Sequence, residues 1–226
     1  IPTTVGMKIQ KLSTQSALLS TSVSGLWQGQ GKQQRVALKA QVASPDLGKL
    51  LASMQYADMI NRGEVNADID IFWSGALTDF SLQTISGVLD LNIKEGQILH
   101  VEPGGSGRVL GLFSLAEIPR RLSLDFSDFF GKGFAFKKMS GHFNFAHGKA
   151  NTDNFLITAP AADIKISGTT DYLTQQFNQV VEVYPKTSGV LPVIGALAAG
   201  PIGIAAGVVA QAVLKKPIGS TTETKY

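Results

Sequence analysis

The chain has 226 residues, no cysteine and a formal net charge of +3. Without cysteine, neither disulfide bonds nor thiol chemistry is available. Only 16% of the residues are charged, which is too few to build a nucleic-acid surface despite the basic balance. The length fits one domain, or a sheet with an appendage.

The first 43 residues are expected to contain two or three strands. Val36, Leu38 and Ala40 are apolar, whereas Lys39 and Gln41 between them are polar. Side chains along a strand point alternately to the two faces of a sheet, so this pattern predicts one apolar and one solvated face.

A helix is expected near residues 45–60. Ser44 is placed at the N-cap, Pro45 at the first helical position and Asp46 in the first turn. The apolar residues that follow at helical spacing are Leu47, Leu50, Leu51 and Met54. This spacing predicts about three helical turns.

Two further strands follow in the first half of the chain. Ile69 and Ile71 alternate with aspartates, and Leu89 and Leu91 alternate with polar residues in the same way. Glu95-Gly96 is expected to form a tight hairpin turn.

A glycine-containing loop at residues 103–107 leads into a short apolar helix near 107–118, which Pro119 would end. A strand, a glycine loop and a helix are also the elements of a dinucleotide-binding fingerprint. That fingerprint requires glycine at position 110, where this chain has Leu110, and the neighbouring strands are expected to be antiparallel. We therefore disfavour a phosphate-binding loop.

Residues 120–184 show the clearest alternation and predict an antiparallel meander with one apolar face. The apolar positions are Leu122, Leu124, Phe126, Phe134, Phe136, Phe143, Phe145, Ile164 and Ile166. Short polar connections separate the runs. The phenylalanines fall away from most charges, a pattern that suits a core or an apolar ligand better than nucleic-acid stacking.

Residues 187–214 contain no Asp, Glu, Lys or Arg. The preferred interpretation is two short apolar helices that break at Gly200-Pro201, because proline lacks an amide donor and disfavours helix in the residue before it. A conventional transmembrane helix and simple packing against the sheet remain alternatives.

No constellation of catalytic residues is found, and no enzyme activity is predicted. His142 and His147 lie five residues apart across a strand and a turn, and neither they nor His100 has a cysteine or paired carboxylate nearby. Metal ligation is therefore disfavoured, and a solvated strand histidine is expected. No cofactor is predicted.

Several segments together resemble a known family. They are SPDLGKLL, DIDIFWSG, SGVLDLNIKEGQILHVEPG, GRVLGLFSLAEIPRRLSLDFSDFFGKGFAF, MSGHFNF, NTDNFLITAPAADIKISGTTDY, VVEVYP and LPVIGALAAGPIGIAAGVVAQAVL. In order and spacing, from about Ser44 onward, they resemble the C-terminal region of the YhdP family of bacterial AsmA-like proteins.

The resemblance implies a lipid-transport bridge in the periplasm of a Gram-negative cell envelope. The full-length protein would be anchored in the inner membrane, and an apolar β-groove would carry phospholipid toward the outer membrane. The expected groove-lining residues, on one concave face, are Ile69, Ile71, Leu89, Leu91, Leu122, Leu124, Phe126, Phe134, Phe136, Phe143, Phe145, Ile164 and Ile166. The expected membrane-contacting residues are Leu191, Ile194, Leu197, Ile204 and Val208.

The expected fold is therefore mainly β with a few helices. Residues 1–185 would form the curved antiparallel groove, and residues 186–226 an apolar helical hairpin and the start of a further strand of a longer chain. The expected ligands are phospholipid acyl chains and a membrane surface, with no nucleic acid. A structural or adaptor module of the envelope, with a closed apolar core and no lipid cargo, is the alternative function.

Overall fold

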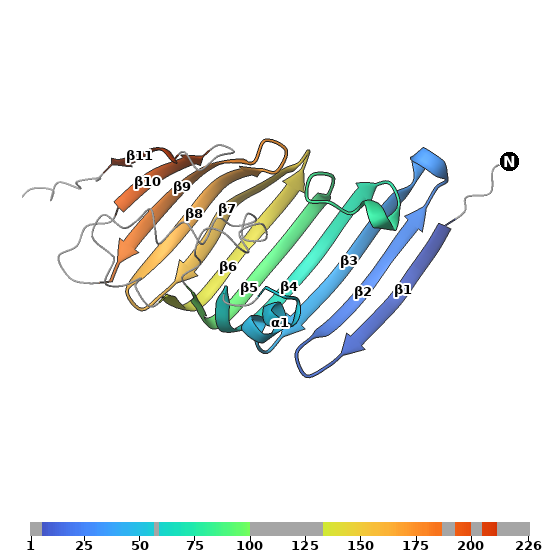
Figure 1. Cartoon of the computed structure of the whole chain (residues 1–226), viewed down its shortest axis with the longest axis horizontal. Helices are drawn as coiled ribbons and strands as arrows, with labels where there is room; N and C mark the ends of the chain where they lie inside the picture. Colours follow the sequence, from blue (N-terminus) through green and yellow to red (C-terminus); the bar gives the residue numbers. More distant parts are fainter. Residues whose placement is uncertain (1–5, 57–58, 100–132, 187–192, 200–204, 212–226) are drawn as a thin grey trace, which may run out of the picture.

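A computed structural model describes residues 6–56, 59–99, 133–186, 193–199 and 205–211. In this part of the chain, eleven strands form one antiparallel sheet in which each strand pairs with its neighbours in the sequence (Figure 1). The strands are β1 (Gly6–Gln15), β2 (Ser20–Gln28), β3 (Arg35–Ser44), β4 (Ile60–Ser74), β5 (Ser86–Ile98), β6 (Phe134–Ala146), β7 (Lys149–Thr158), β8 (Ala162–Asp171), β9 (Gln176–Pro185), β10 (Val193–Ala199) and β11 (Ala205–Gln211).

The strand register keeps the apolar residues on one face. Ile69 of β4 lies opposite Leu89 of β5, and Leu89 lies opposite Phe143 of β6. Residues directly opposite each other project from the same face of a sheet. A slip of one residue would send a whole strand's apolar set to the polar face, so the burial pattern fixes the register.

The expected mainly-β class and the antiparallel meander are confirmed for the described residues. The first 43 residues contribute three strands, and the alternating runs around Ile69, Leu89, Phe143 and Ile164 are all strands. The expected strand with Leu122, Leu124 and Phe126 and the expected helix near 107–118 lie outside the described residues.

The predicted helix near residues 45–60 is shorter and starts later than expected. Helix α1 spans Leu47–Ser53, with Asp46 as its N-cap. The Asp46 carboxylate accepts a hydrogen bond from the Lys49 amide at 3.0 Å, while the Ser44 hydroxyl accepts one from the Asp46 amide at 3.2 Å. Placing the N-cap at Ser44 was therefore wrong. Ser44 accepts its hydrogen bond from Asp46, before the helix begins, whereas Asp46 accepts one from Lys49 within the first turn.

The predicted hairpin turn at Glu95-Gly96 is also wrong. Strand β5 continues through both residues to Ile98, and Glu95 adopts a positive φ of 51° within it. On the neighbouring strand, Arg62 and Gly63 also have positive φ, at 59° and 97°. The turn-forming residues therefore produce a local distortion across β4 and β5, because both strands still have partners to pair with beyond it.

The predicted C-terminal helices differ from the structure, which has strands β10 and β11 where both are described. β10 pairs with β9 along its length, from Val193 opposite Val183 to Ala199 opposite Phe177. An edge strand offers unpaired backbone groups, and valine and isoleucine favour extended backbone, which together outweigh the weak helix preference of a glycine-containing run. Ile194, Leu197 and Val208 lie on these strands. Leu191, Ile204 and the expected break at Gly200-Pro201 lie outside the described residues.

We predict that Asp46→Ala lowers the free energy of unfolding by about 1 kcal/mol at neutral pH, the usual cost of losing an N-cap. The hydrogen bond from the Lys49 amide holds the pKa of Asp46 below its ordinary value of 3.8. Its folded pKa is depressed, so this contribution is present above the ordinary value and lost as the pH falls below it. Urea unfolding at pH 7 and below pH 3.8 measures both effects.

The exposed Asp153 supplies the control for this prediction. Asp153→Ala should leave the free energy of unfolding nearly unchanged. Equal stabilities of Asp46→Ala and the unmodified chain at pH 7 would contradict the capping role.

Candidate functional site

The apolar face is of mixed exposure over β3 to β5. Its buried side chains there, at 0–6% exposure, are Val36, Val65, Trp73, Ile93 and Ile98. Five leucine and isoleucine side chains on this face of β3 to β5 keep an intermediate exposure, and we call them the apolar strip: Leu38, Ile69, Ile71, Leu89 and Leu91. They come from three neighbouring strands, with Leu38 opposite Ile71 and Ile69 opposite Leu89. Their side chains therefore form a continuous aliphatic surface across the strands, because opposite residues lie within contact distance.

Two connecting segments border the apolar strip at opposite ends of the strands (Figure 1). Helix α1 connects β3 to β4, and its Leu47 packs against the buried apolar cluster. At the other end, the connection from β4 to β5 contains the 3₁₀-helix η2 (Leu77–Asp79). Leu82 in this connection packs on the same cluster, and the Phe80 ring meets Trp73 edge-on with centroids 5.5 Å apart.

Most large apolar side chains on the same face are buried from β6 to β9. Residues there include Met139, Phe143, Phe145, Phe155, Ile157, Ile164, Ile166, Val181 and Val183, all at most 4% exposed. Phe155 packs against Phe143 with ring centroids 5.4 Å apart. This part of the face is a close-packed core, unlike the apolar strip beside it.

The structure brings together the predicted lining residues that it describes, but in two environments. Ile69, Ile71, Leu89 and Leu91 belong to the half-buried apolar strip. The six others are buried residues of β6 and β8: Phe134, Phe136, Phe143, Phe145, Ile164 and Ile166. All ten lie on the apolar side of the sheet, and their contact with lipid stays a prediction.

Buried polar groups interrupt the apolar face near the end of β8. Thr170 and Gln179 are both buried, and the Gln179 amide donates to the Thr170 hydroxyl at 3.1 Å. The Tyr172 ring packs against the apolar cluster, and its hydroxyl has no hydrogen-bond partner among the described residues. Burial raises the pKa of Tyr172 well above its ordinary value, so the phenol stays neutral and its O–H can donate a hydrogen bond.

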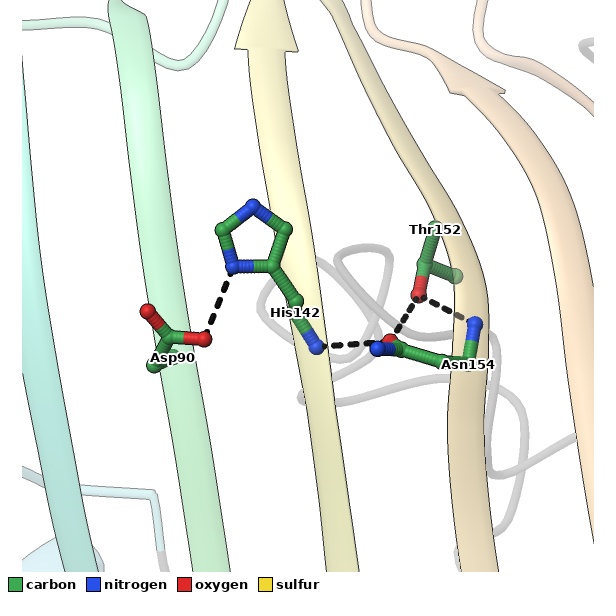
Figure 2. A network of polar contacts seen from close by, with 4 residues as sticks. All are labelled: Asp90, His142, Thr152 and Asn154. Carbon is green, nitrogen blue, oxygen red and sulfur yellow. Dashed lines mark hydrogen bonds and ion pairs between the residues drawn. The ribbon is translucent and has the colours of Figure 1, made fainter.

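The opposite face is polar and carries a ladder of hydrogen bonds across β3 to β6. Asp68 and Asp90 lie directly opposite each other, and their two carboxylates would repel if neither had a hydrogen-bond partner. Each instead has a partner on its outer side. The Gln41 amide donates to Asp68 at 3.0 Å, and His142 Nδ1 lies 2.7 Å from the Asp90 carboxylate (Figure 2).

A bulge in β7 completes this polar network. The pairing of β7 shifts between Thr152 and Phe155, so the strand holds an extra residue there. The Asn154 side chain occupies the resulting gap and accepts a hydrogen bond from the His142 backbone amide at 2.9 Å (Figure 2). The bulge therefore re-aims a side chain to satisfy a backbone donor that the ladder leaves free.

Two shallow hollows lie over this polar network. The larger has a volume of about 420 Å³, and its lining includes Asn66, Asp68, Asp90, Asn92, Ser140, His142 and Asn154. The smaller, of about 330 Å³, shares Asp68 and Asp90 with it. Sequence reasoning treated His142 as a solvated residue and missed its pairing with Asp90. The alternation along each strand places both residues on the polar face and could be read from the sequence. The register that sets them opposite each other could not.

The polar network contains none of the groupings that covalent catalysis needs. In the described ranges, no hydrogen bond joins His142 to a hydroxyl nucleophile, and no three His, Asp or Glu side chains converge on a possible metal position. The hydrogen bonds of the network instead pair Gln41 with Asp68 and pair His142 with Asp90 and Asn154. Their arrangement supports a structural role that fixes the register of the polar face.

An open antiparallel sheet with one apolar and one polar face defines the class of this protein: a one-sided β-sheet module. The chain belongs to the YhdP family, since the family model described as YhdP protein matches residues 1–226. It is 27% identical over 208 residues to the Intermembrane phospholipid transporter YhdP of Escherichia coli (strain K12). That alignment covers 90% of this chain and 16% of the relative, so the chain spans about a sixth of the relative's length.

No solved structure matches this chain. Among the described residues, no helix has the length and apolarity needed to cross a membrane.

We predict that Asn154→Ala lowers the free energy of unfolding by about 1 kcal/mol, because it leaves the His142 amide without its acceptor. Urea unfolding measures the loss, and faster hydrogen exchange at the His142 amide locates it. Asn144→Ala is the matched control, since Asn144 is an exposed asparagine on the same face of β6. Equal effects of the two substitutions would refute the bridging role of Asn154.

Proposed function

We propose that this chain is a segment of a phospholipid conduit and that the apolar strip is the floor of its lipid groove. In this proposal an acyl chain lies across β3 to β5, in contact with Leu38, Ile69, Ile71, Leu89 and Leu91. Helix α1 and the connection from β4 to β5 form the two sides of the groove. The chain binds and guides lipid and performs no covalent chemistry.

The main support for a lipid groove is the continuous aliphatic surface of the apolar strip, which stays half-exposed among the described residues. Exposed apolar surface of this kind marks an interaction site, because its burial releases free energy. A methylene group buried on it would contribute about 0.8 kcal/mol. Neighbouring strands lie about 4.8 Å apart, so an acyl chain crossing them meets a new side chain at each strand without passing through water.

Family membership supports the same cargo. The relative from Escherichia coli is described as an intermembrane phospholipid transporter, and this chain corresponds to about a sixth of it. We infer that the segment works in the periplasm of the cell envelope as part of a longer protein. Anchoring of that protein in the inner membrane and delivery of lipid at the outer membrane belong to this proposal.

The second candidate is a structural or adaptor module of the envelope with a closed apolar core. The buried face of β6 to β9 favours it, since those side chains are already removed from solvent. The two functions differ in one measurable respect: a conduit binds phospholipid on the apolar strip, whereas a structural module binds none.

Leu89→Gln should reduce the phospholipid that copurifies with the protein, detected by native mass spectrometry. An acyl chain lying on the glutamine amide would remove it from water at a cost of about 1–3 kcal/mol. Each 1.4 kcal/mol of lost binding free energy lowers the affinity about tenfold. The neighbouring Val88 is also half-buried but points to the polar face, so Val88→Gln is the matched control. It should leave the bound phospholipid within about twofold of the unmodified level.

Thermal unfolding of both variants separates loss of binding from loss of fold. The absence of phospholipid from the unmodified protein would favour the structural module. Equal losses in folded Leu89→Gln and Val88→Gln would rule out the apolar strip as the binding surface.

A further inference from the structure

The ends of β4, β5 and β6 beside helix α1 extend past the neighbouring strands. Among the described residues, pairing between β3 and β4 stops at Val65, and pairing between β6 and β7 stops at Lys138. β4, β5 and β6 continue to pair with one another, as far as Ile60, Ile98 and Phe134. These three strands therefore form a projecting end of the sheet, at the side where α1 connects β3 to β4 (Figure 1).

The projecting end departs from regular strand geometry at one level of all three strands. Lys94 and Glu95 are consecutive exposed residues of β5, and Lys137 and Lys138 are consecutive exposed residues of β6. Arg62 of β4 and Glu95 have left-handed φ values of 59° and 51°, a conformation that is unfavourable for residues other than glycine. As a result, β5 and β6 each present two outward side chains where regular alternation would present one.

Four exposed cations lie at this level, and we call them the basic row: Arg62, Lys94, Lys137 and Lys138. Lys94 and Lys138 lie directly opposite each other, an arrangement that is unfavourable for like charges. Lys94 pairs with Glu64 at 3.3 Å. Within the described ranges, no ion pair involves Arg62, Lys137 or Lys138. The basic row therefore holds positive charge that its protein neighbours do not neutralise.

An anionic membrane surface fits the basic row in charge and in shape. Because the row lies on an end of the sheet that projects past the neighbouring strands, a flat surface can approach its exposed cations together. Each lysine or arginine near anionic headgroups adds to the binding free energy. Met54, which follows α1 at the same end of the sheet, is 57% exposed. Exposed apolar and cationic side chains together are the combination that binds membrane interfaces.

We propose that the basic row docks this end of the sheet on the phosphate groups of an anionic phospholipid membrane. Since α1 forms one side of the proposed groove, docking would bring that side of the groove to the membrane. Docking through the basic row goes beyond the proposed function, because it requires no lipid on the apolar strip.

Cosedimentation of the unmodified chain with vesicles tests membrane docking. The probes are vesicles of phosphatidylcholine with an equal share of phosphatidylglycerol, and vesicles of phosphatidylcholine alone. We expect binding to the anionic vesicles that weakens at high salt, because salt screens exposed charges. Equal binding to both kinds of vesicle, or binding to neither, would overturn docking on an anionic membrane.

The double variant Lys137→Gln/Lys138→Gln tests the basic row itself. It should weaken binding to the anionic vesicles about 30-fold, because each lysine near such a surface strengthens binding about fivefold. The control is Lys8→Gln/Lys11→Gln, which removes the same charge from exposed positions of β1 and should change binding less than about twofold. Equal losses in the two double variants would show that binding follows net charge alone and would overturn the basic row as the docking site.

Thermal unfolding of each variant checks that the fold is retained. If the basic-row double variant fails to fold, Arg62→Gln, with an expected loss of about fivefold, is compared with Lys8→Gln in its place. Leu89→Gln separates this inference from the proposed function, since it should lose copurified phospholipid and keep vesicle binding. Loss of vesicle binding in folded Leu89→Gln would overturn docking through the basic row.

Discussion

The apolar face of this sheet depends on one constraint, the shared parity of side chains across successive antiparallel pairings. Leu38, Ile71, Ile69, Leu89 and Phe143 lie on one side because each strand is held in a single register against the next. Since strand side chains repeat every two residues, a slip of one position in β4 or β5 would place Asp68, Asp70 or Asp90 among the apolar residues. The cost of burying those carboxylates is what makes the register unique.

The polar face reinforces this register with specific pairs. Gln41, Asp68, Asp90 and His142 stand in one line across four strands, and each pairing is possible only in the observed alignment. Exposed pairs of this kind contribute little stability individually. Their value lies in discrimination between registers, since a slipped strand would lose these partners. The bulge at Asn154 adds a further fixed point, because only one position of β7 can supply the acceptor for the His142 amide.

Alternation of apolar and polar residues allowed the strands and the shared face to be predicted from the sequence. It could not reveal how exposed each part of that face would be. Leu89 and Phe143 have the same parity and are directly paired, yet one is half-exposed and the other is buried. This difference arises from what packs over each strand, and exposure of that kind is a tertiary property absent from local pattern.

The errors at Glu95-Gly96 and at β10 and β11 share a physical cause. Local preference favoured a turn in the first case and helices in the second, but both segments lie beside a strand with free backbone donors and acceptors. Pairing satisfies those groups along all of β10, and at β5 it holds Lys94 and Gly96 on either side of Glu95. Glu95 accepts a left-handed conformation within the strand as a consequence. Tertiary hydrogen bonding therefore overrode local preference at both places.

The most direct test of the account is the contact between an acyl chain and the apolar strip. Methyl-labelled protein with bound phospholipid would be examined by NMR for nuclear Overhauser effects from acyl-chain methylene protons. We predict such effects to the methyl groups of Leu38, Ile69, Ile71, Leu89 and Leu91, and none to those of Val88 or Leu156 on the polar face. Effects to the polar-face methyl groups, or none to the apolar strip in protein that retains phospholipid, would contradict it.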